Sequence, residues 1–78
     1  MTIKEIALQL GKKTISGFEI TKRRGVLTST WLLYKKEKYY YYFDVNEKII
    51  FDENHKYSLE ELEIEFQNLY FEIDCEIS

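Results

Sequence analysis

Two side chains of this 78-residue sequence have the chemistry of a nucleophile and its base: Cys75 and His55, each the only residue of its type. Nucleophilic catalysis needs the nucleophile beside a base that a third group orients. No local motif such as a Gly-x-Ser-x-Gly elbow surrounds either residue. We therefore expect His55 to be a solvated loop residue and the protein not to be an enzyme.

Oxygen and nitrogen donors follow one another from Asp52 to His55, in the order Asp-Glu-Asn-His. Four consecutive side chains cannot converge on one ion, and the stretch lacks the spacing and the glycine of an EF-hand loop. The glycines Gly11, Gly17 and Gly25 are scattered and form no phosphate-binding loop. The sequence predicts no metal site and no cofactor.

Carboxylates are concentrated near the C-terminus. They are Glu60, Glu61, Glu63 and Glu65, followed by Glu72, Asp74 and Glu76. General acid–base catalysis needs one carboxyl group of a pair in an apolar pocket, whereas a capped amphipathic helix turns such residues toward solvent. One interpretation is therefore a solvated helix face. The sharper hypothesis is a partner-binding surface that imitates a row of phosphates and occupies a basic groove of another protein.

An aromatic run forms the second candidate surface. It consists of Tyr39, Tyr40, Tyr41, Tyr42 and Phe43. Alternate side chains of a strand point to opposite faces, so helices on one face would leave two or three of these tyrosines exposed on the other. One interpretation is ordinary β propensity with cross-strand pairing. The alternative is a partner-binding patch, because tyrosine combines a large contact area with a polar tip. Basic turns near residues 22–25 and 35–38 also fit the stacking of single-stranded nucleic acid.

The net charge of −3 conceals an asymmetry along the chain. Residues 1–43 carry nine basic and three acidic side chains, whereas residues 44–78 carry two basic and eleven acidic ones. Either the two halves attract each other in the folded protein, or one of them forms a contact surface. An acidic surface would attract a basic protein, and a basic surface would attract nucleic acid.

Capping boxes and residue periodicity predict the elements that hold these residues. Thr2 with Glu5 begins a helix over residues 2–10, and Ser58 with Glu61 begins a second helix that runs to about Tyr70. Alternating segments predict four strands, at residues 14–21, 26–34, 39–45 and 48–52. Residues 71–78 fit either a helix or a strand.

The predicted fold is therefore a single α+β domain over residues 1–78. It is a small antiparallel four-stranded meander with an N-terminal and a C-terminal helix packed on one face.

The opening residues 1–11, MTIKEIALQLG, followed by Thr14-Ile15-Ser16, resemble the start of the helix-turn-helix of lactose-repressor-type regulators. The resemblance implies a first helix, a glycine turn and a recognition helix that reads the major groove. The sequence departs from this pattern after Gly11, because the connection is short and residues 17–21 are β-like. We therefore interpret the matching stretch as a capped amphipathic helix.

One cysteine, no apolar signal-peptide core and no long apolar run predict a cytoplasmic protein without membrane contact. We expect a non-enzymatic protein-binding module, an inhibitor or accessory factor that occupies the surface of a protein partner, such as a nucleic-acid-handling protein. Its size and acidity match small inhibitors that phages and mobile elements encode, including anti-CRISPR proteins. The alternative is a small nucleic-acid-binding protein that uses the basic turns and an aromatic hairpin formed by Trp31, Tyr34 and the aromatic run. A homodimer stays open in either case.

Overall fold

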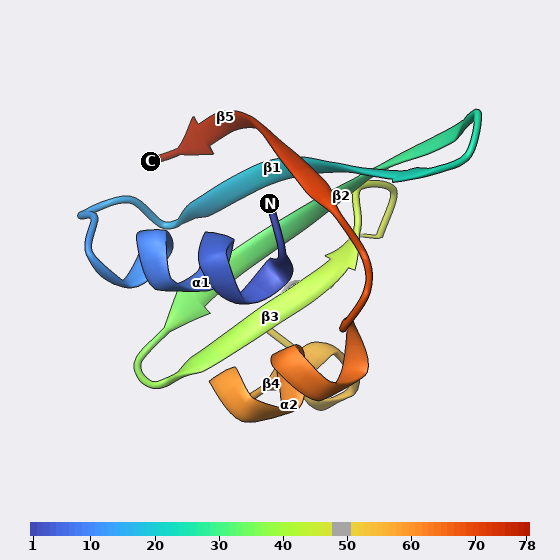
Figure 1. Ribbon diagram of the computed structural model, residues 1–78. Coiled ribbons are helices and arrows are strands. Elements are labelled where there is room, and N and C mark those ends of the chain that lie inside the picture. The colour runs from blue at the N-terminus through green and yellow to red at the C-terminus, as the bar shows by residue number, and fades with distance from the viewer. Residues whose placement is uncertain (48–50) are drawn as a thin grey trace.

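Across residues 1–47 and 51–78, which the computed structural model describes, the chain forms a five-stranded sheet with both helices on one face (Figure 1). The strand order is β4-β3-β2-β1-β5, and every neighbouring pair is antiparallel. The elements are α1 (Ile3–Gly11), β1 (Gly17–Arg24), β2 (Leu27–Lys36), β3 (Tyr39–Asp44), the 3₁₀ turn η1 (Glu53–His55), β4 (Lys56–Tyr57), α2 (Leu59–Glu65) and β5 (Phe71–Ile77). The α+β class and the meander of the first three strands agree with the prediction.

Two tight hairpins connect the first three strands. Arg24 pairs with Leu27, so the first loop is Gly25-Val26, and Gly25 has a φ of 65°. Glycine adopts this left-handed conformation at no steric cost, and two-residue hairpin loops require it. The basic residues predicted to form the first turn therefore lie in β1, and only Gly25 of that stretch is in the loop.

The predicted fourth strand, residues 48–52, is not formed where it can be tested. Residues 48–50 lie outside the described part of the chain, and Phe51 and Asp52 are not in a strand. The strand beside β3 is β4, in which Tyr57 pairs with Tyr40. Before it, the chain turns at η1, where the Asp52 carboxylate accepts a hydrogen bond from the backbone N–H of His55 at 3.0 Å.

The C-terminal end of the chain is a strand rather than a helical extension. α2 ends at Glu65 instead of about Tyr70, and Asn68 adopts a left-handed φ of 67°. β5 then pairs with the outer edge of β1. A longer helix would leave the backbone groups of that edge without partners, whereas β5 satisfies them and also buries Phe71 in the core.

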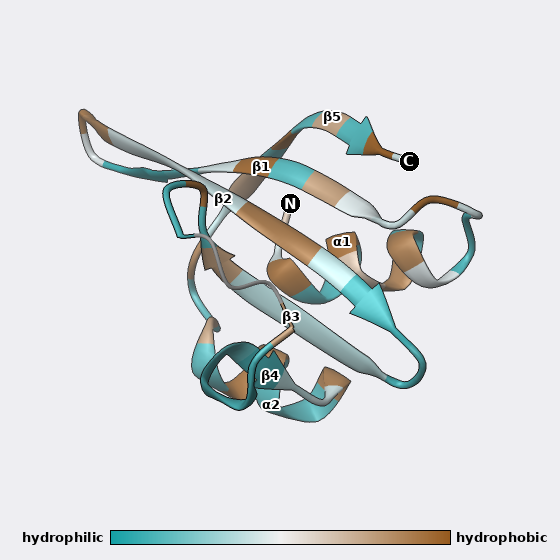
Figure 2. Cartoon of the chain, turned by 180° about the vertical axis from the view of Figure 1, so that it is seen from behind, coloured by the Kyte–Doolittle hydropathy of each residue, from teal (hydrophilic) through white to brown (hydrophobic). Residues whose placement is uncertain are grey.

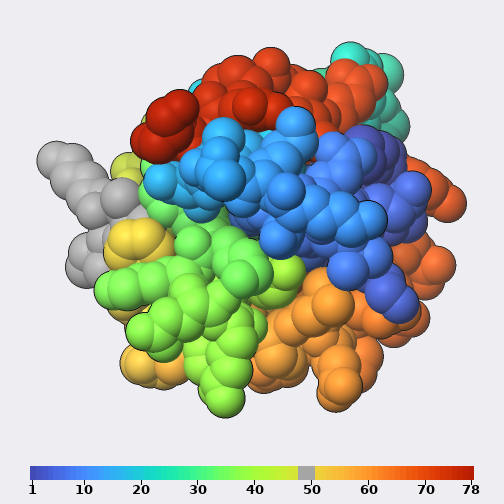
Figure 3. Space-filling view, turned by 90° about the vertical axis from the view of Figure 1, so that its left-hand side faces the viewer, coloured from blue at the N-terminus to red at the C-terminus, as the bar shows by residue number. Residues whose placement is uncertain are grey.

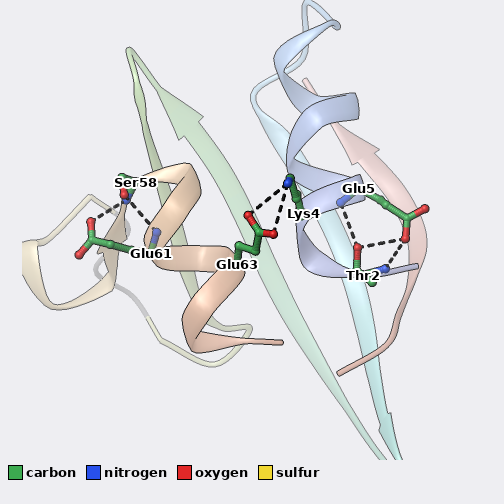
Figure 4. A network of polar contacts seen from close by, with 6 residues as sticks. All are labelled: Thr2, Lys4, Glu5, Ser58, Glu61 and Glu63. Carbon is green, nitrogen blue, oxygen red and sulfur yellow. Dashed lines mark hydrogen bonds and ion pairs between the residues drawn. The ribbon is translucent and has the colours of Figure 1, made fainter. Parts of the chain in front are cut away.

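Both helices begin at the predicted capping boxes (Figure 4). The backbone N–H of Glu5 donates to Thr2 Oγ1 at 3.3 Å, and the N–H of Thr2 donates to the Glu5 carboxylate at 3.0 Å. Ser58 and Glu61 repeat this exchange at 3.1 and 2.9 Å. Such reciprocal bonds satisfy N–H groups that the first turn of a helix leaves free.

The chain after α1 enters β1, so the likeness to a helix-turn-helix ends with the first helix. Instead of preceding a recognition helix, α1 packs its apolar side onto the sheet. The core between the helices and the sheet comprises Ile3, Ile6, Ala7, Leu10, Phe18, Ile20, Leu33, Tyr40, Tyr42, Leu62 and Phe71. Among the described residues, no helix has the length and apolarity needed to cross a membrane.

Candidate functional site

His55 lies between two carboxylates instead of extending into solvent. Its Nδ1 is 2.6 Å from Asp52 Oδ1, and its Nε2 is 2.5 Å from Glu47 Oε2. The side chain is 21% exposed and its ring meets the ring of Phe43 edge to face. The expectation of a solvated histidine is therefore wrong, because packing on the sheet and two acidic partners hold the ring in place.

The hydrogen bond from His55 favours the ionised form of the Asp52 carboxyl group. It lowers the pKa of the Asp52 carboxyl group, with a smaller contribution from the charge interaction between the two side chains. Each ring nitrogen of His55 faces a carboxylate oxygen, one on Asp52 and one on Glu47. These two contacts hold the segment before β4 in place.

The sheet order separates His55 from Cys75. His55 packs on Phe43 of β3, whereas Cys75 lies in β5 opposite Glu19 of β1. Two strands lie between β3 and β5, which corresponds to about 14 Å at the usual strand spacing. Cys75 faces the carboxylate of Glu19, Sγ to Oε2 3.7 Å, and its pKa is raised by desolvation and then by that negative charge. The two residues do not form a catalytic pair.

The described residues hold no group of three His, Cys, Asp or Glu side chains suited to a metal ion. A hollow lies between the start of α1 and the end of α2. It is lined by Thr2, Ile3, Lys4, Glu63, Phe66, Gln67 and Asn68, and its volume is ≈ 180 Å³. Ligand pockets usually measure roughly 300–1,000 Å³, so this hollow is too small to argue for a small-molecule site.

The tyrosine run alternates across the sheet as predicted, but most of it is not exposed. Tyr40 and Tyr42 belong to the helix-side core and are 5% and 4% exposed. The Tyr40 hydroxyl donates to the carbonyl oxygen of Ala7 in α1 at 3.2 Å. The Tyr42 ring stacks on Trp31 with centroids 4.6 Å apart.

The opposite face of the sheet is covered as well. Tyr41 is 8% exposed and packs edge to face on Phe51, and Phe43 is fully buried beneath His55. Figure 2 shows this face of the sheet from behind. The expected open tyrosine face is therefore wrong, because Phe51 and His55 pack on Tyr41 and Phe43 and complete a second small cluster of rings.

Tyr39 is the member of the run that remains half-exposed. Its ring lies beneath the ammonium groups of Lys56 and Lys38, whose Nζ atoms are 4.1 and 5.5 Å from the ring centroid. A partner-binding role for Tyr39–Tyr42 therefore stays a prediction. The prediction assumed an exposed surface, and Tyr40, Tyr41 and Tyr42 do not provide one.

Several C-terminal carboxylates pair with bases of the N-terminal half. Glu63 pairs with Lys4 at 3.2 Å (Figure 4), Glu76 with Lys13 at 2.7 Å, and Glu72 with Arg23 at 3.3 Å. Asp74 accepts a hydrogen bond from the Thr21 hydroxyl at 2.5 Å. The two oppositely charged halves thus attract each other in the fold, although exposed pairs of this kind stabilise a protein only slightly.

The remaining predicted carboxylates lie together on the outside of α2. Glu60, Glu61 and Glu65 are exposed, and Ile64 among them is 69% exposed. Residues three and four positions apart are neighbours on a helix surface, so Ile64 lies beside Glu60 and Glu61, and Glu65 beside Glu61. We call these four residues the α2 outer face. Their negative field reaches Tyr57, whose pKa is raised by burial first and then by Glu65 and Glu61.

Comparison with protein-family models, curated proteins and solved structures finds no match for this chain.

Sequence reasoning missed Ile64 as a surface residue. The apolar side of the predicted helix contains Leu59, Leu62, Phe66 and Leu69, and Ile64 is on the other side of the helical wheel. An aliphatic residue outside the apolar stripe and between carboxylates is the signal that could have identified it.

Proposed function

We propose that this protein is a non-enzymatic binding module that uses the α2 outer face to occupy a basic surface of a protein partner. The observation that carries the proposal is the combination of Ile64, 69% exposed, with Glu60, Glu61 and Glu65 around it. An apolar side chain within a charged rim is the arrangement in which a central anchor supplies affinity and the rim supplies orientation.

The carboxylates favour a particular kind of partner. Spaced negative charges on a short helix attract the same basic grooves that bind the phosphates of nucleic acids. An inhibitor or accessory factor of a nucleic-acid-handling protein fits this chemistry best. Opposite charges across such an interface mainly accelerate association and select the partner.

The proposal is tested by capturing partners from a nuclease-treated lysate of the native host with the tagged protein. We expect one protein to be retained in near-stoichiometric amount. The double variant Glu60→Lys/Glu65→Lys should lose most of this binding and its salt dependence, because it reverses the charge without disturbing the capping box of Glu61. Ile64→Asp should weaken binding while it keeps the acidic charge.

A matched control is Glu37→Lys/Glu53→Lys, which changes the net charge equally at exposed positions outside α2. Retained binding in this control and lost binding in the α2 variant would support the proposal. Equal losses in both would show that net charge alone controls capture. Unchanged binding in both α2 variants would overturn the proposal.

A further inference from the structure

The hairpin of β1 and β2 extends beyond the strands beside it. β5 pairs with β1 only as far as Lys22, and β3 pairs with β2 from Trp31 onward. Residues 23–29 therefore form a two-stranded ribbon that pairs only with itself in the described part of the sheet. Figure 1 shows this ribbon projecting from the body of the molecule, and Figure 3 shows it and α2 at opposite ends of the surface.

The tip of the ribbon is apolar although the fold does not require it. Val26 is 98% exposed and Leu27 is 71% exposed, and the hydrophobic tip is visible in Figure 2. Gly25 supplies the positive φ that the turn needs, with open space around its Cα. Polar residues are the usual choice beside such a glycine. Two exposed aliphatic side chains at the tip of this hairpin therefore indicate a contact with another molecule.

The sides of the ribbon are basic and rich in hydroxyl groups. Arg23 and Arg24 are exposed in β1, and Thr28 and Ser29 lie opposite Arg23 and Lys22 in β2. From Ile20 to Lys36 the sequence contains five basic residues and no acidic one. Guanidinium and hydroxyl groups are among the side-chain groups that contact nucleic-acid phosphates.

We propose that this ribbon binds duplex nucleic acid, with Arg23 and Arg24 on phosphates and Val26 and Leu27 in the groove. A two-stranded ribbon fits the major groove of B-DNA, which is about 12 Å wide. Apolar side chains contact the methyl group of thymine in that groove. A membrane is a poorer match because the tip lacks the tryptophan and tyrosine that anchor proteins at lipid interfaces. This proposal does not depend on the α2 outer face.

Glu72 moderates the proposed site. Its Oε1 lies 3.3 Å from Arg23 Nε, and both side chains are about 60% exposed. A phosphate would have to compete with this carboxylate for Arg23. Removing the charge of Glu72 should therefore strengthen binding, which is a gain that a merely structural ion pair would not produce.

The test measures the fluorescence anisotropy of a labelled duplex of about 20 base pairs at several salt concentrations. Each phosphate neutralised contributes about −0.9 to the slope of log K against log salt, so two arginines give about −1.8. Affinity should then fall about 12-fold between about 50 and about 200 mM salt. Arg23→Gln/Arg24→Gln should remove this dependence, and Glu72→Gln should tighten binding.

Two further variants test the apolar contact and the location of the site. Val26→Ser/Leu27→Ser should weaken binding without a change in the salt slope. Lys36→Gln/Lys38→Gln loses the same charge at the other end of β2 and should bind as the unmodified protein does. These two variants and the two arginine and Glu72 variants change only exposed side chains. The circular dichroism spectra of all four should therefore match that of the parent chain.

Absence of duplex binding at about 50 mM salt would overturn the proposal, as would an equal loss in the Lys36/Lys38 control. Binding to phosphatidylserine vesicles that is lost in the Val26/Leu27 variant, with no duplex binding, would replace it with a membrane contact. Duplex binding that persists in Glu60→Lys/Glu65→Lys would keep the ribbon proposal separate from the function proposed for α2.

Discussion

The buried hydroxyl groups of Tyr40 and Tyr42 should respond in opposite ways to the same substitution. Both residues lie on the helix side of β3 and both belong to the main core. The Tyr40 hydroxyl has a hydrogen bond to the carbonyl oxygen of Ala7, whereas the Tyr42 hydroxyl has no partner among the described residues. Replacement by phenylalanine removes only the hydroxyl and leaves the ring packing in place.

The magnitudes follow from the cost of an unpaired polar group. Burying a hydroxyl group without a partner costs about 1–3 kcal/mol, so Tyr42→Phe should raise the free energy of unfolding by about 1 kcal/mol. A neutral hydrogen bond contributes about 0.5–1.5 kcal/mol, so Tyr40→Phe should lower it by a similar amount. For a domain of this size, 1 kcal/mol corresponds to a shift of about 4–8 °C in Tm.

Urea unfolding, followed by tryptophan fluorescence and circular dichroism, measures both effects. The midpoint should rise for Tyr42→Phe and fall for Tyr40→Phe, with an unchanged m-value because the surface exposed on unfolding is the same. The parent chain and the double variant complete the comparison, and the double variant should lie close to the parent. A lower midpoint for Tyr42→Phe would refute the reasoning, because it would mean that the hydroxyl has a stabilising partner in solution.

Three further predictions concern pH and local structure. Burial raises the pKa of Tyr40, Tyr42 and Tyr57 above the ordinary value of 10.0, and desolvation together with Glu19 raises the pKa of Cys75 above 9.0. The folded state therefore keeps protons that the unfolded state releases, so the free energy of unfolding should fall as the pH rises above about 9, and less steeply in Tyr42→Phe, when measured by urea unfolding from about pH 8 to 11. Gly17→Ala should lower the free energy of unfolding by about 1–3 kcal/mol, because its Cβ would overlap the carbonyl oxygen of Leu33 and the ring of Tyr34; an unchanged urea midpoint would contradict this. Ser58→Ala should lower the free energy of unfolding by about 0.5–2 kcal/mol, because it removes the cap of α2. Ser58→Asp keeps a hydrogen-bond acceptor at this position, so its Tm in thermal unfolding should lie close to that of the parent chain.

Local patterns in the sequence correctly predicted the helix starts and the first three strands, because residues close together in the chain specify them. Thr2 with Glu5 and Ser58 with Glu61 identify both helix starts, because a capping box is complete within four residues. Alternation identified the first three strands, although their ends moved by a few residues. The hairpin turn moved because Gly25 alone supplies the conformation that a two-residue loop requires.

The candidate surfaces were less predictable because exposure depends on segments that are distant in the sequence. Alternation placed Tyr40 and Tyr42 on one face and Tyr41 on the other, but it did not reveal that Phe51 and His55 cover Tyr41 and Phe43. The acidic residues were visible as a group. Their division into paired members, such as Glu72, and members of the α2 outer face depends on which bases the fold brings near them.

The sequence by itself determined the class of the fold, the two helix starts and the division of charge into a basic half and an acidic half. These follow from periodicity, capping and charge, which act within a few residues or over the whole chain. Only the tertiary structure decided that residues 71–77 are a strand, because both periodicities suit them and the unpaired edge of β1 makes the difference. It alone also decided which tyrosines are buried and which part of β1 and β2 projects, since burial and protrusion depend on where neighbouring strands end.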